Sequence, residues 1–183
     1  MRVIAGTARS MPLRTVKGMD VRPTTDRTKE TLFNILQPWI PGSRFLDLFA
    51  GSGSIGIEAL SRGAECAVFV EKARASQDLI LENLEFTKLI GGAKLEKGDA
   101  VSVLRKLEGA DPFDVIFMDP PFDHGLEKDV LEYLSTSSLP AEDGIIVVEA
   151  SPKTDFSYLP EMGYSVVKER VYGRSQHIFL RKN

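Results

Sequence analysis

Two kinds of apolar pattern alternate along the chain from residue 44 to residue 150. Short, continuous apolar runs predict strands that are buried on both faces, and the longer mixed stretches between them predict helices. The predicted strands are residues 44–49, 66–71, 93–98, 113–118 and 144–150. The predicted helices are residues 54–62, 73–89, 100–107 and 125–135. Such alternation predicts a mostly parallel sheet covered by helices on both faces.

The two ends of the chain depart from this alternation. Residues 164–172 and 175–182 predict two strands separated by a Gly-Arg turn, which form an antiparallel hairpin. At the other end, residues 2–8 and 13–17 predict a second, shorter hairpin. A parallel sheet closed by an antiparallel hairpin is a seven-stranded variant of the Rossmann architecture. We therefore expect an α/β fold with a β-hairpin extension over residues 1–22 and a single domain over residues 23–183.

A further helix is predicted between the first hairpin and the first strand of the sheet. Thr25 is a suitable N-cap, and Asp26 would lie in the positive first turn of the helix. Lys29 and Glu30 are expected on its solvated face. The apolar residues on its other face are Leu32, Ile35, Leu36 and Trp39.

Composition places the chain among ordinary globular proteins. Its 183 residues, 43% of them hydrophobic, are enough for one domain with a sizeable core. The longest strongly apolar run, residues 145–148, is far too short to span a membrane, and the first residues lack the apolar stretch of a signal peptide. A cytoplasmic location is therefore expected. Cys66 is the only cysteine, which excludes an internal disulfide and a cysteine-rich metal site.

Charge is distributed unevenly along the chain. The net charge of −3 is the sum of +5 in residues 1–44, −12 in residues 45–165 and +4 in residues 166–183. Basic side chains bind polyanions by displacing counterions, so two basic ends point to a nucleic-acid partner.

A glycine-rich turn follows the first predicted strand of the sheet. Gly51-x-Gly53-x-x-Gly56 lies between this strand and a helix, which is the context that the pattern requires for a nucleotide-type ligand. Glu71 ends the next strand, about 20 residues further on, where it could accept hydrogen bonds from two ribose hydroxyls. A nicotinamide dinucleotide and an adenosyl cofactor both fit these features.

Acidic residues at the ends of the strands favour the adenosyl cofactor. Asp47, just before the glycine turn, would repel a pyrophosphate but suits the ammonium or sulfonium of S-adenosylmethionine. Asp99 is placed to accept a hydrogen bond from an adenine amino group. With Glu71 and Asp119, these residues close four successive strands.

The segment Asp119-Pro120-Pro121-Phe122 has the groups needed to methylate an amino nitrogen. The lone pair of an exocyclic amine is delocalised into the base, and two acceptors aimed at its hydrogens localise that pair. The Asp119 carboxylate and the Pro120 carbonyl are these acceptors in our interpretation, and the two prolines fix the backbone. Phe122 would stack on the base. A strand-ending turn is the alternative explanation for the four residues taken alone.

Four segments carry a resemblance to a known family: Arg22 to Asn34, Asp47 to Gly56, Glu58 to Gly63 and Asp119 to Phe122. Together they resemble the bacterial 16S rRNA guanine-N2 methyltransferases, which modify one guanine in the small-subunit head, and the likeness covers nearly the whole chain. The Asp-Pro-Pro-Phe motif alone is shared with adenine-N6 methyltransferases, so the specific part is Arg-Pro-Thr-Thr-Asp. The resemblance implies S-adenosylmethionine as methyl donor and an assembled or assembling small ribosomal subunit as substrate.

The resemblance also implies further contacts. It places Thr24 and Arg27 at the methionine end of the cofactor, although helix capping explains the threonine equally well, and Ala100 beside Asp99 in the cofactor site. The family's hairpin is usually richer in basic residues than residues 9–13 are here, which leaves fewer phosphate contacts. The candidate RNA-binding residues come from both basic ends of the chain: Arg2, Arg9, Arg14, Lys17, Arg22 and Arg174.

We therefore expect a monomeric enzyme that transfers a methyl group directly to guanine N2, without a covalent intermediate or a metal. Two alternatives stay open: an adenine-N6 methyltransferase of DNA or RNA, and a non-catalytic nucleotide-binding or RNA-binding protein on the same fold. A redox protein with a Rossmann fold is a third, weaker alternative. Among residues outside the motifs, His124 is expected to be solvated and His177 to be structural.

Overall fold

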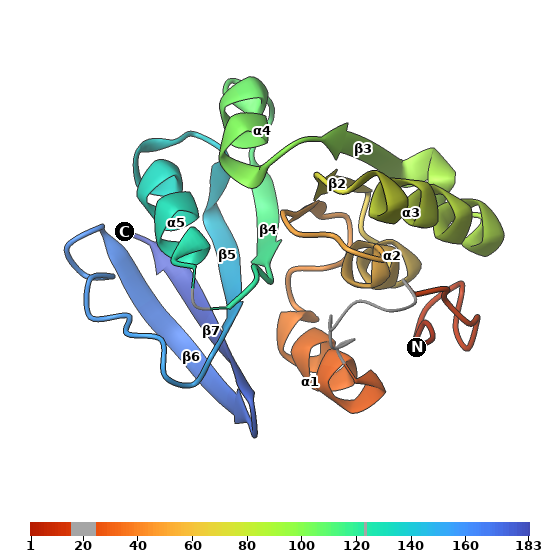
Figure 1. The fold of residues 1–183 in the computed structure, drawn as a ribbon, viewed down its shortest axis with the longest axis horizontal. Helices are drawn as coiled ribbons and strands as arrows, with labels where there is room; N and C mark the ends of the chain where they lie inside the picture. The colour runs from red at the N-terminus through yellow and green to blue at the C-terminus, as the bar shows by residue number, and fades with distance from the viewer. Residues whose placement is uncertain (16–24, 123) are drawn as a thin grey trace.

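The computed structural model describes residues 1–15, 25–122 and 124–183, which form one mixed sheet covered by helices (Figure 1). Within these ranges, seven strands lie in the order β3-β2-β1-β4-β5-β7-β6. The pairs from β3 to β5 are parallel, and β7 lies antiparallel between β5 and β6. The strands are β1 (Arg44–Asp47), β2 (Cys66–Glu71), β3 (Ala93–Lys97), β4 (Phe113–Met118), β5 (Pro140–Ala150), β6 (Tyr164–Tyr172) and β7 (Ser175–Lys182). The predicted fold class is confirmed.

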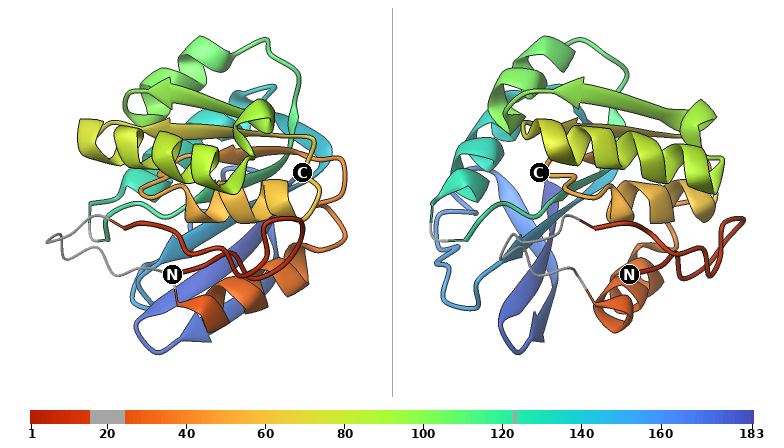
Figure 2. Two further views of the ribbon diagram at one scale, coloured as in Figure 1. Left: turned by 90° about the vertical axis from the view of Figure 1, so that its right-hand side faces the viewer. Right: turned by 45° about the vertical axis from the view of Figure 1, so that its right-hand side comes forward.

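Helices cover both faces of this sheet (Figure 2). Alternate residues of β4 show how: Val115 and Phe117 join a core with α1, α2 and α3, whereas Ile116 and Met118 join a second core with α4 and α5. The period-two alternation of a strand therefore supplies both cores at once. The helices are α1 (Asp26–Leu36), α2 (Ser54–Ser61), α3 (Arg74–Thr87), α4 (Ala100–Leu107) and α5 (Leu126–Thr136), with a short 3₁₀ turn, η1 (Ile90–Gly92). In the described ranges, no helix is long and apolar enough to cross a membrane.

The start of β5 is the largest difference from the predicted boundaries. This strand begins at Pro140 rather than at residue 144. Proline and glycine both weaken a strand pattern, which hid the first residues of β5. Gly144 is required by close packing, because a Cβ there would lie 2.9 Å from the carbonyl oxygen of Ala141 and 3.1 Å from that of Asp114.

The predicted N-terminal hairpin is wrong in detail. Residues 1–15 form a loop with one isolated antiparallel bridge, between Arg2 and Pro12, in place of two strands. The backbone N–H groups of Ile4 and Ala5 donate to the Glu58 carboxylate of α2 at 2.8 and 3.0 Å. Backbone N–H groups of Val3, Ser10 and Leu13 still donate across the loop, to Met11, Val3 and Met1, so the two halves are paired without forming two regular strands. The apolar residues of the loop, Val3, Ala8 and Leu13, belong to the α2 side of the core.

Lys29 is buried, which corrects its expected place on a solvated helix face. Its side chain is 0% exposed and donates to the carbonyl oxygen of Arg2 at 2.6 Å. Glu58 lies 3.4 Å from the same Nζ and also receives Arg62 Nε at 2.7 Å. Burial lowers the pKa of Lys29, and Glu58 opposes that shift. This buried network ties the N-terminal loop, α1 and α2 together.

Candidate active site

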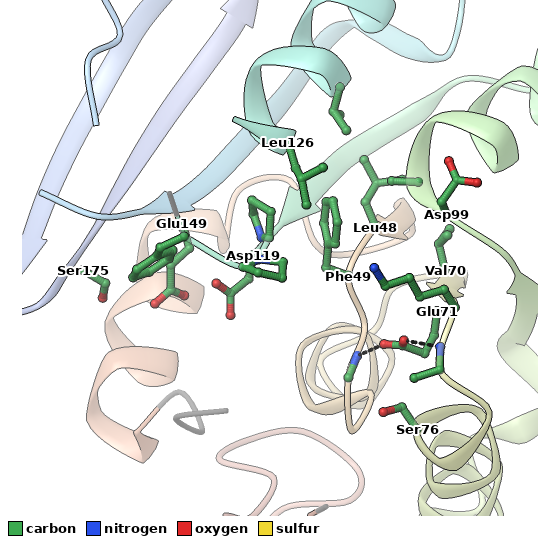
Figure 3. A pocket seen from close by; sticks show the side chains of 18 of the residues that line it. Leu48, Phe49, Val70, Glu71, Ser76, Asp99, Asp119, Leu126, Glu149 and Ser175 are labelled. Atoms are coloured by element: carbon green, nitrogen blue, oxygen red, sulfur yellow. Dashed lines mark hydrogen bonds between the residues drawn. The ribbon is translucent and has the colours of Figure 1, made fainter. Parts of the chain in front are cut away.

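The carboxyl ends of the central strands open into a cavity of about 620 Å³. Both predicted motifs border it, because β1 and β4 are neighbours in the sheet and their following turns leave from the same edge (Figure 3). The volume lies in the usual range for small-molecule sites. The lining residues that the sequence pointed to are Gly51, Glu71, Asp99, Ala100, Asp119, Pro120, Pro121, Phe122 and Arg174.

The three glycines of the turn after β1 do different work. Gly51 and Gly53 have φ angles of 54° and 78°, in the left-handed region that favours glycine. Gly56 lies inside α2, where a Cβ would come within 2.4 Å of the Phe69 ring. The first two glycines therefore shape the turn, and the third lets α2 pack closely on β2. Gly51 borders the cavity, and Gly53 faces Ile80 instead.

Glu71 connects the glycine turn to the segment after β2. Its Oε2 accepts a hydrogen bond from the backbone N–H of Gly51 at 2.9 Å, and its Oε1 accepts from Ala73 at 2.8 Å (Figure 3). Both bonds hold the carboxylate at the cavity wall. A carboxylate fixed in this way is suited to accept hydrogen bonds from two ribose hydroxyls. This predicted role of Glu71 stays a proposal.

Asp47 is buried beneath the glycine turn and does not line the cavity. Its side chain is 1% exposed, and its Oδ2 accepts from the backbone N–H of Gly56 at 3.2 Å. Oδ1 has no hydrogen-bond partner among the described residues. Burial raises the pKa of Asp47 to about 7, and the charge of Glu71 adds to that shift. An unpaired acceptor in this position fits a nearby cationic group better than an anionic one.

Asp99 begins α4 as its N-cap. Its carboxylate accepts from the backbone N–H of Ser102 at 3.0 Å, and the hydrogen bonds from Ser102 lower its pKa. The next residue, Ala100, is buried at the cavity wall. One carboxylate oxygen of Asp99 accepts the hydrogen bond from Ser102. The other oxygen could accept from an adenine amino group, so the predicted role of Asp99 stays a proposal.

Asp119 follows β4 directly, and the strand alternation places it on the same face as Val115 and Phe117. Burial raises its pKa well above the ordinary value, and the carboxylates of Glu149 and Asp47 raise it further. Asp119 is thus a strong proton acceptor in an acidic, partly dry environment. Pro120, Pro121 and Phe122 continue along the cavity wall.

Glu149 is a cavity residue that sequence reasoning missed. It lies near the end of β5, and Figure 3 shows its carboxylate beside that of Asp119, pointing into the same space. The signal was present: Glu149 follows an apolar run, as the four identified acids do. Only the position of β5 next to β4 brings it to Asp119.

The remaining predicted residues differ in where they lie. Arg174 borders the cavity, whereas Arg9 is exposed on the N-terminal loop. Arg2 and Arg14 form ion pairs within the chain, with Asp26 at 3.0 Å and Glu82 at 2.7 Å. Arg27 is exposed and does not line the cavity, although Thr25 and Thr28 beside it do. The residues outside the described ranges are Lys17, Arg22 and Thr24.

The strand order, the antiparallel β7 and the cavity at the ends of β1, β4 and β5 define a Rossmann-like methyltransferase fold. Within this class, the chain belongs to the family described as conserved hypothetical protein 95, whose model matches residues 1–181.

Two curated relatives share the name ribosomal RNA small subunit methyltransferase D. The Escherichia coli protein is 36% identical over 174 residues, covering 95% of this chain and 86% of that protein. The Haemophilus influenzae protein is 34% identical, covering 94% and 89%. The solved structure of YhhF from Escherichia coli superposes with a TM-score of 0.88 at 35% identity, covering 100% of this chain and 97% of that one.

Proposed function

We propose that this protein transfers a methyl group from S-adenosylmethionine to the exocyclic N2 of a guanine in 16S rRNA. The observation that carries the proposal is the single cavity shared by the glycine turn and the Asp119 to Phe122 turn. A donor site and an amine-holding site must lie this close for direct transfer. Relatives at 34 and 36% identity that are named small-subunit rRNA methyltransferases support the choice of substrate.

The cavity fits the proposed donor. Glu71 and Asp99 supply acceptors for ribose and adenine, and the unpaired Asp47 oxygen beneath the glycine turn favours a cation. Bound there, S-adenosylmethionine would supply an electrophilic methyl group whose sulfur keeps the electron pair of the broken bond. Leu48, Val70 and Val101 give the same part of the cavity apolar walls. Such walls suit an adenine ring.

The other part of the cavity would hold the amine. Asp119 and the Pro120 carbonyl accept the two N2 hydrogens, so that the nitrogen lone pair points at the methyl group. The nitrogen uses that pair for the new bond and gives up one proton, for which the raised pKa of Asp119 makes this carboxylate a suitable acceptor. Orienting amine and methyl group in line can contribute up to roughly 7 to 11 kcal/mol. Phe122 would stack on the base after it leaves its helix, which offsets part of the unstacking energy.

RNA would be bound by basic residues outside the acidic part of the cavity. Arg174 lies at the cavity and Arg9 on the exposed N-terminal loop, so both are available to phosphates. Arg2 and Arg14 would first have to leave Asp26 and Glu82. A ribosomal substrate implies a reaction in the cytoplasm, and a monomer is our proposal because the residues given roles here all belong to one chain.

The product of the reaction tests the proposal. Small ribosomal subunits from a strain that lacks this methylation are incubated with protein and tritiated S-adenosylmethionine, and the RNA is digested to nucleosides for mass spectrometry. We expect N2-methylguanosine in 16S rRNA and no label in DNA. N6-methyladenosine as the product would favour the adenine alternative, and cofactor binding without transfer would favour a non-catalytic protein.

A further inference from the structure

Glu149 faces the proposed base site from the strand next to Asp119. The two side chains share one face of the sheet, because Asp119 continues the alternation of Val115 and Phe117 and Glu149 that of Ile145 and Val147. Glu149 is only 7% exposed and lines the cavity. Glu149 is therefore a buried acid and not a solvated surface residue.

His177 holds this carboxylate in place. Glu149 and His177 are directly opposed in the antiparallel pairing of β5 and β7, and His177 Nε2 lies 2.9 Å from Glu149 Oε2. His177 Nδ1 has no partner among the described residues, so the ring proton belongs on Nε2, where Glu149 accepts it. The imidazole is 0% exposed, with the ring of Tyr172 edge-on at 4.9 Å between centroids. The packed ring therefore fixes the carboxylate.

Oε1 of Glu149 remains for a ligand. No hydrogen bond to this atom occurs among the described residues, and Figure 3 shows the carboxylate turned towards the cavity. Asp119 lies beside it, and burial together with the Glu149 charge raises the pKa of Asp119, so this carboxyl group favours a proton or a hydrogen-bond donor next to it. A ligand that brings two adjacent N–H groups would supply a donor to Glu149 Oε1 and a second donor to Asp119.

Guanine and adenine differ at this point. The Watson–Crick edge of guanine presents the N1–H donor next to the N2 amine, whereas adenine presents an unprotonated N1 next to its N6 amine. We infer that Glu149 accepts the N1–H of the target base while Asp119 and Pro120 hold its amine, so that the carboxylate pair selects guanine over adenine. This inference rests on the proposed function and assigns its base specificity to Glu149, with His177 as a positioning residue. A carboxylate would repel the N1 lone pair of adenine.

The base 2-aminopurine separates the two interactions, since it keeps the amine at C2 but has an unprotonated N1. Small subunits are reconstituted with 16S rRNA that carries guanine or 2-aminopurine at the methylated position, and kcat/KM is measured for each. We expect the wild-type protein to prefer guanine by about 10- to 100-fold. In Glu149→Gln, whose amide can donate to an unprotonated N1, the preference should fall to about threefold or less.

Glu127→Gln is the matched control, because Glu127 is a buried acid at the start of α5 that does not line the cavity. It should keep the wild-type preference. His177→Phe removes the donor to Glu149 and should reduce the preference for guanine over 2-aminopurine. His177→Gln retains a donor and should keep part of that preference. These two variants test the assignment even if Glu149→Gln folds poorly.

The results separate failure of this inference from failure of the proposed function. Wild-type protein that does not form N2-methylguanosine overturns the function. Wild-type protein that does form it, with the same base preference in folded Glu149→Gln and His177→Phe, overturns the role of Glu149 alone. Calorimetric affinity for S-adenosylmethionine should stay at the wild-type value in all four variants, because a specificity residue acts on the base.

Discussion

The acids on the two sides of the cavity differ in how they are satisfied. On the side of β2 and β3, Glu71 and Asp99 accept hydrogen bonds from backbone N–H groups, and the chain itself holds them in position. On the side of β4 and β5, the Asp119 and Glu149 carboxylates lie beside each other; a side chain, His177, holds Glu149, and the Glu149 charge raises the pKa of Asp119. The first arrangement is fixed before any ligand binds, which suits the hydroxyl and amino groups of the proposed cofactor. The second brings two acids together, and the proposed target base would supply the N–H groups that they lack.

Removal of the Asp119 charge should have the largest effect. In Asp119→Asn the acceptor for the amine and its proton is weakened, so kcat should fall by about 100- to 1,000-fold. Affinity for S-adenosylmethionine should stay close to wild type, since the backbone-held acids on the other side are untouched. Single-turnover transfer to small subunits and titration calorimetry measure the two quantities. Equal losses of turnover and cofactor affinity would mean that Asp119 supports the whole cavity and that the two sides are not separate.

A substitution of Asp47 tests whether a buried, ionised carboxylate beneath the glycine turn destabilises the folded protein. Its pKa is raised to about 7 in the folded protein, so the folded state keeps a proton that the unfolded state has lost. Its contribution to stability is therefore present in full below about pH 4 and disappears as the pH rises to about 7. We expect Asp47→Asn to be more stable than wild type at pH 8 by about 1 to 3 kcal/mol and equal to it at low pH.

Urea unfolding over this pH range, with and without S-adenosylmethionine, checks the prediction for Asp47. A bound cation should stabilise the ionised carboxylate, so saturating cofactor should shrink the difference between Asp47→Asn and wild type. A stability difference between Asp47→Asn and wild type that does not depend on pH would show that ionisation of Asp47 does not destabilise the fold.

On the preorganised side, Glu71→Gln should weaken the cofactor by about tenfold, because an amide accepts hydrogen bonds less strongly than a carboxylate and cannot hold both Gly51 and Ala73 in the same way. Turnover at saturating cofactor should change little. Glu96→Gln, at a buried acid of β3 outside the cavity, is the control for loss of a carboxylate. An unchanged dissociation constant in Glu71→Gln would remove Glu71 from the cofactor site.

The smallest effect is expected at the rim. Arg174→Ala should raise KM for small subunits a few-fold and reduce the slope of log KM against log salt by about one, the signature of a single phosphate contact. Arg14→Ala, at an arginine already paired with Glu82, should change the slope less. Equal slopes in wild type and Arg174→Ala would place the RNA elsewhere on the surface.

Local pattern was sufficient for most elements of the fold. The strands that became β2, β4, β6 and β7 were predicted with the observed ends, because each is a continuous run bounded by turn residues. Patterns failed where a distant segment took part: Lys29 is buried by contacts with Arg2 and Glu58, and the N-terminal loop gave its N–H groups to α2. Neither contact can be predicted from the spacing of apolar and polar residues, because each joins segments that are far apart in the sequence.

The amino-acid sequence alone determined that an acid would lie at the end of each of four strands, near residues 47, 71, 98 and 118, and that a glycine turn and a double-proline turn would leave the sheet. Only the tertiary structure decided which of these ends would meet. β5 lies next to β4, and β7 turns back beside β5, so Glu149 comes to face Asp119 and His177 comes to hold Glu149. The physical reason is that strand order is set by long-range packing of the two cores, whereas sequence periodicity records only which face of an element is buried.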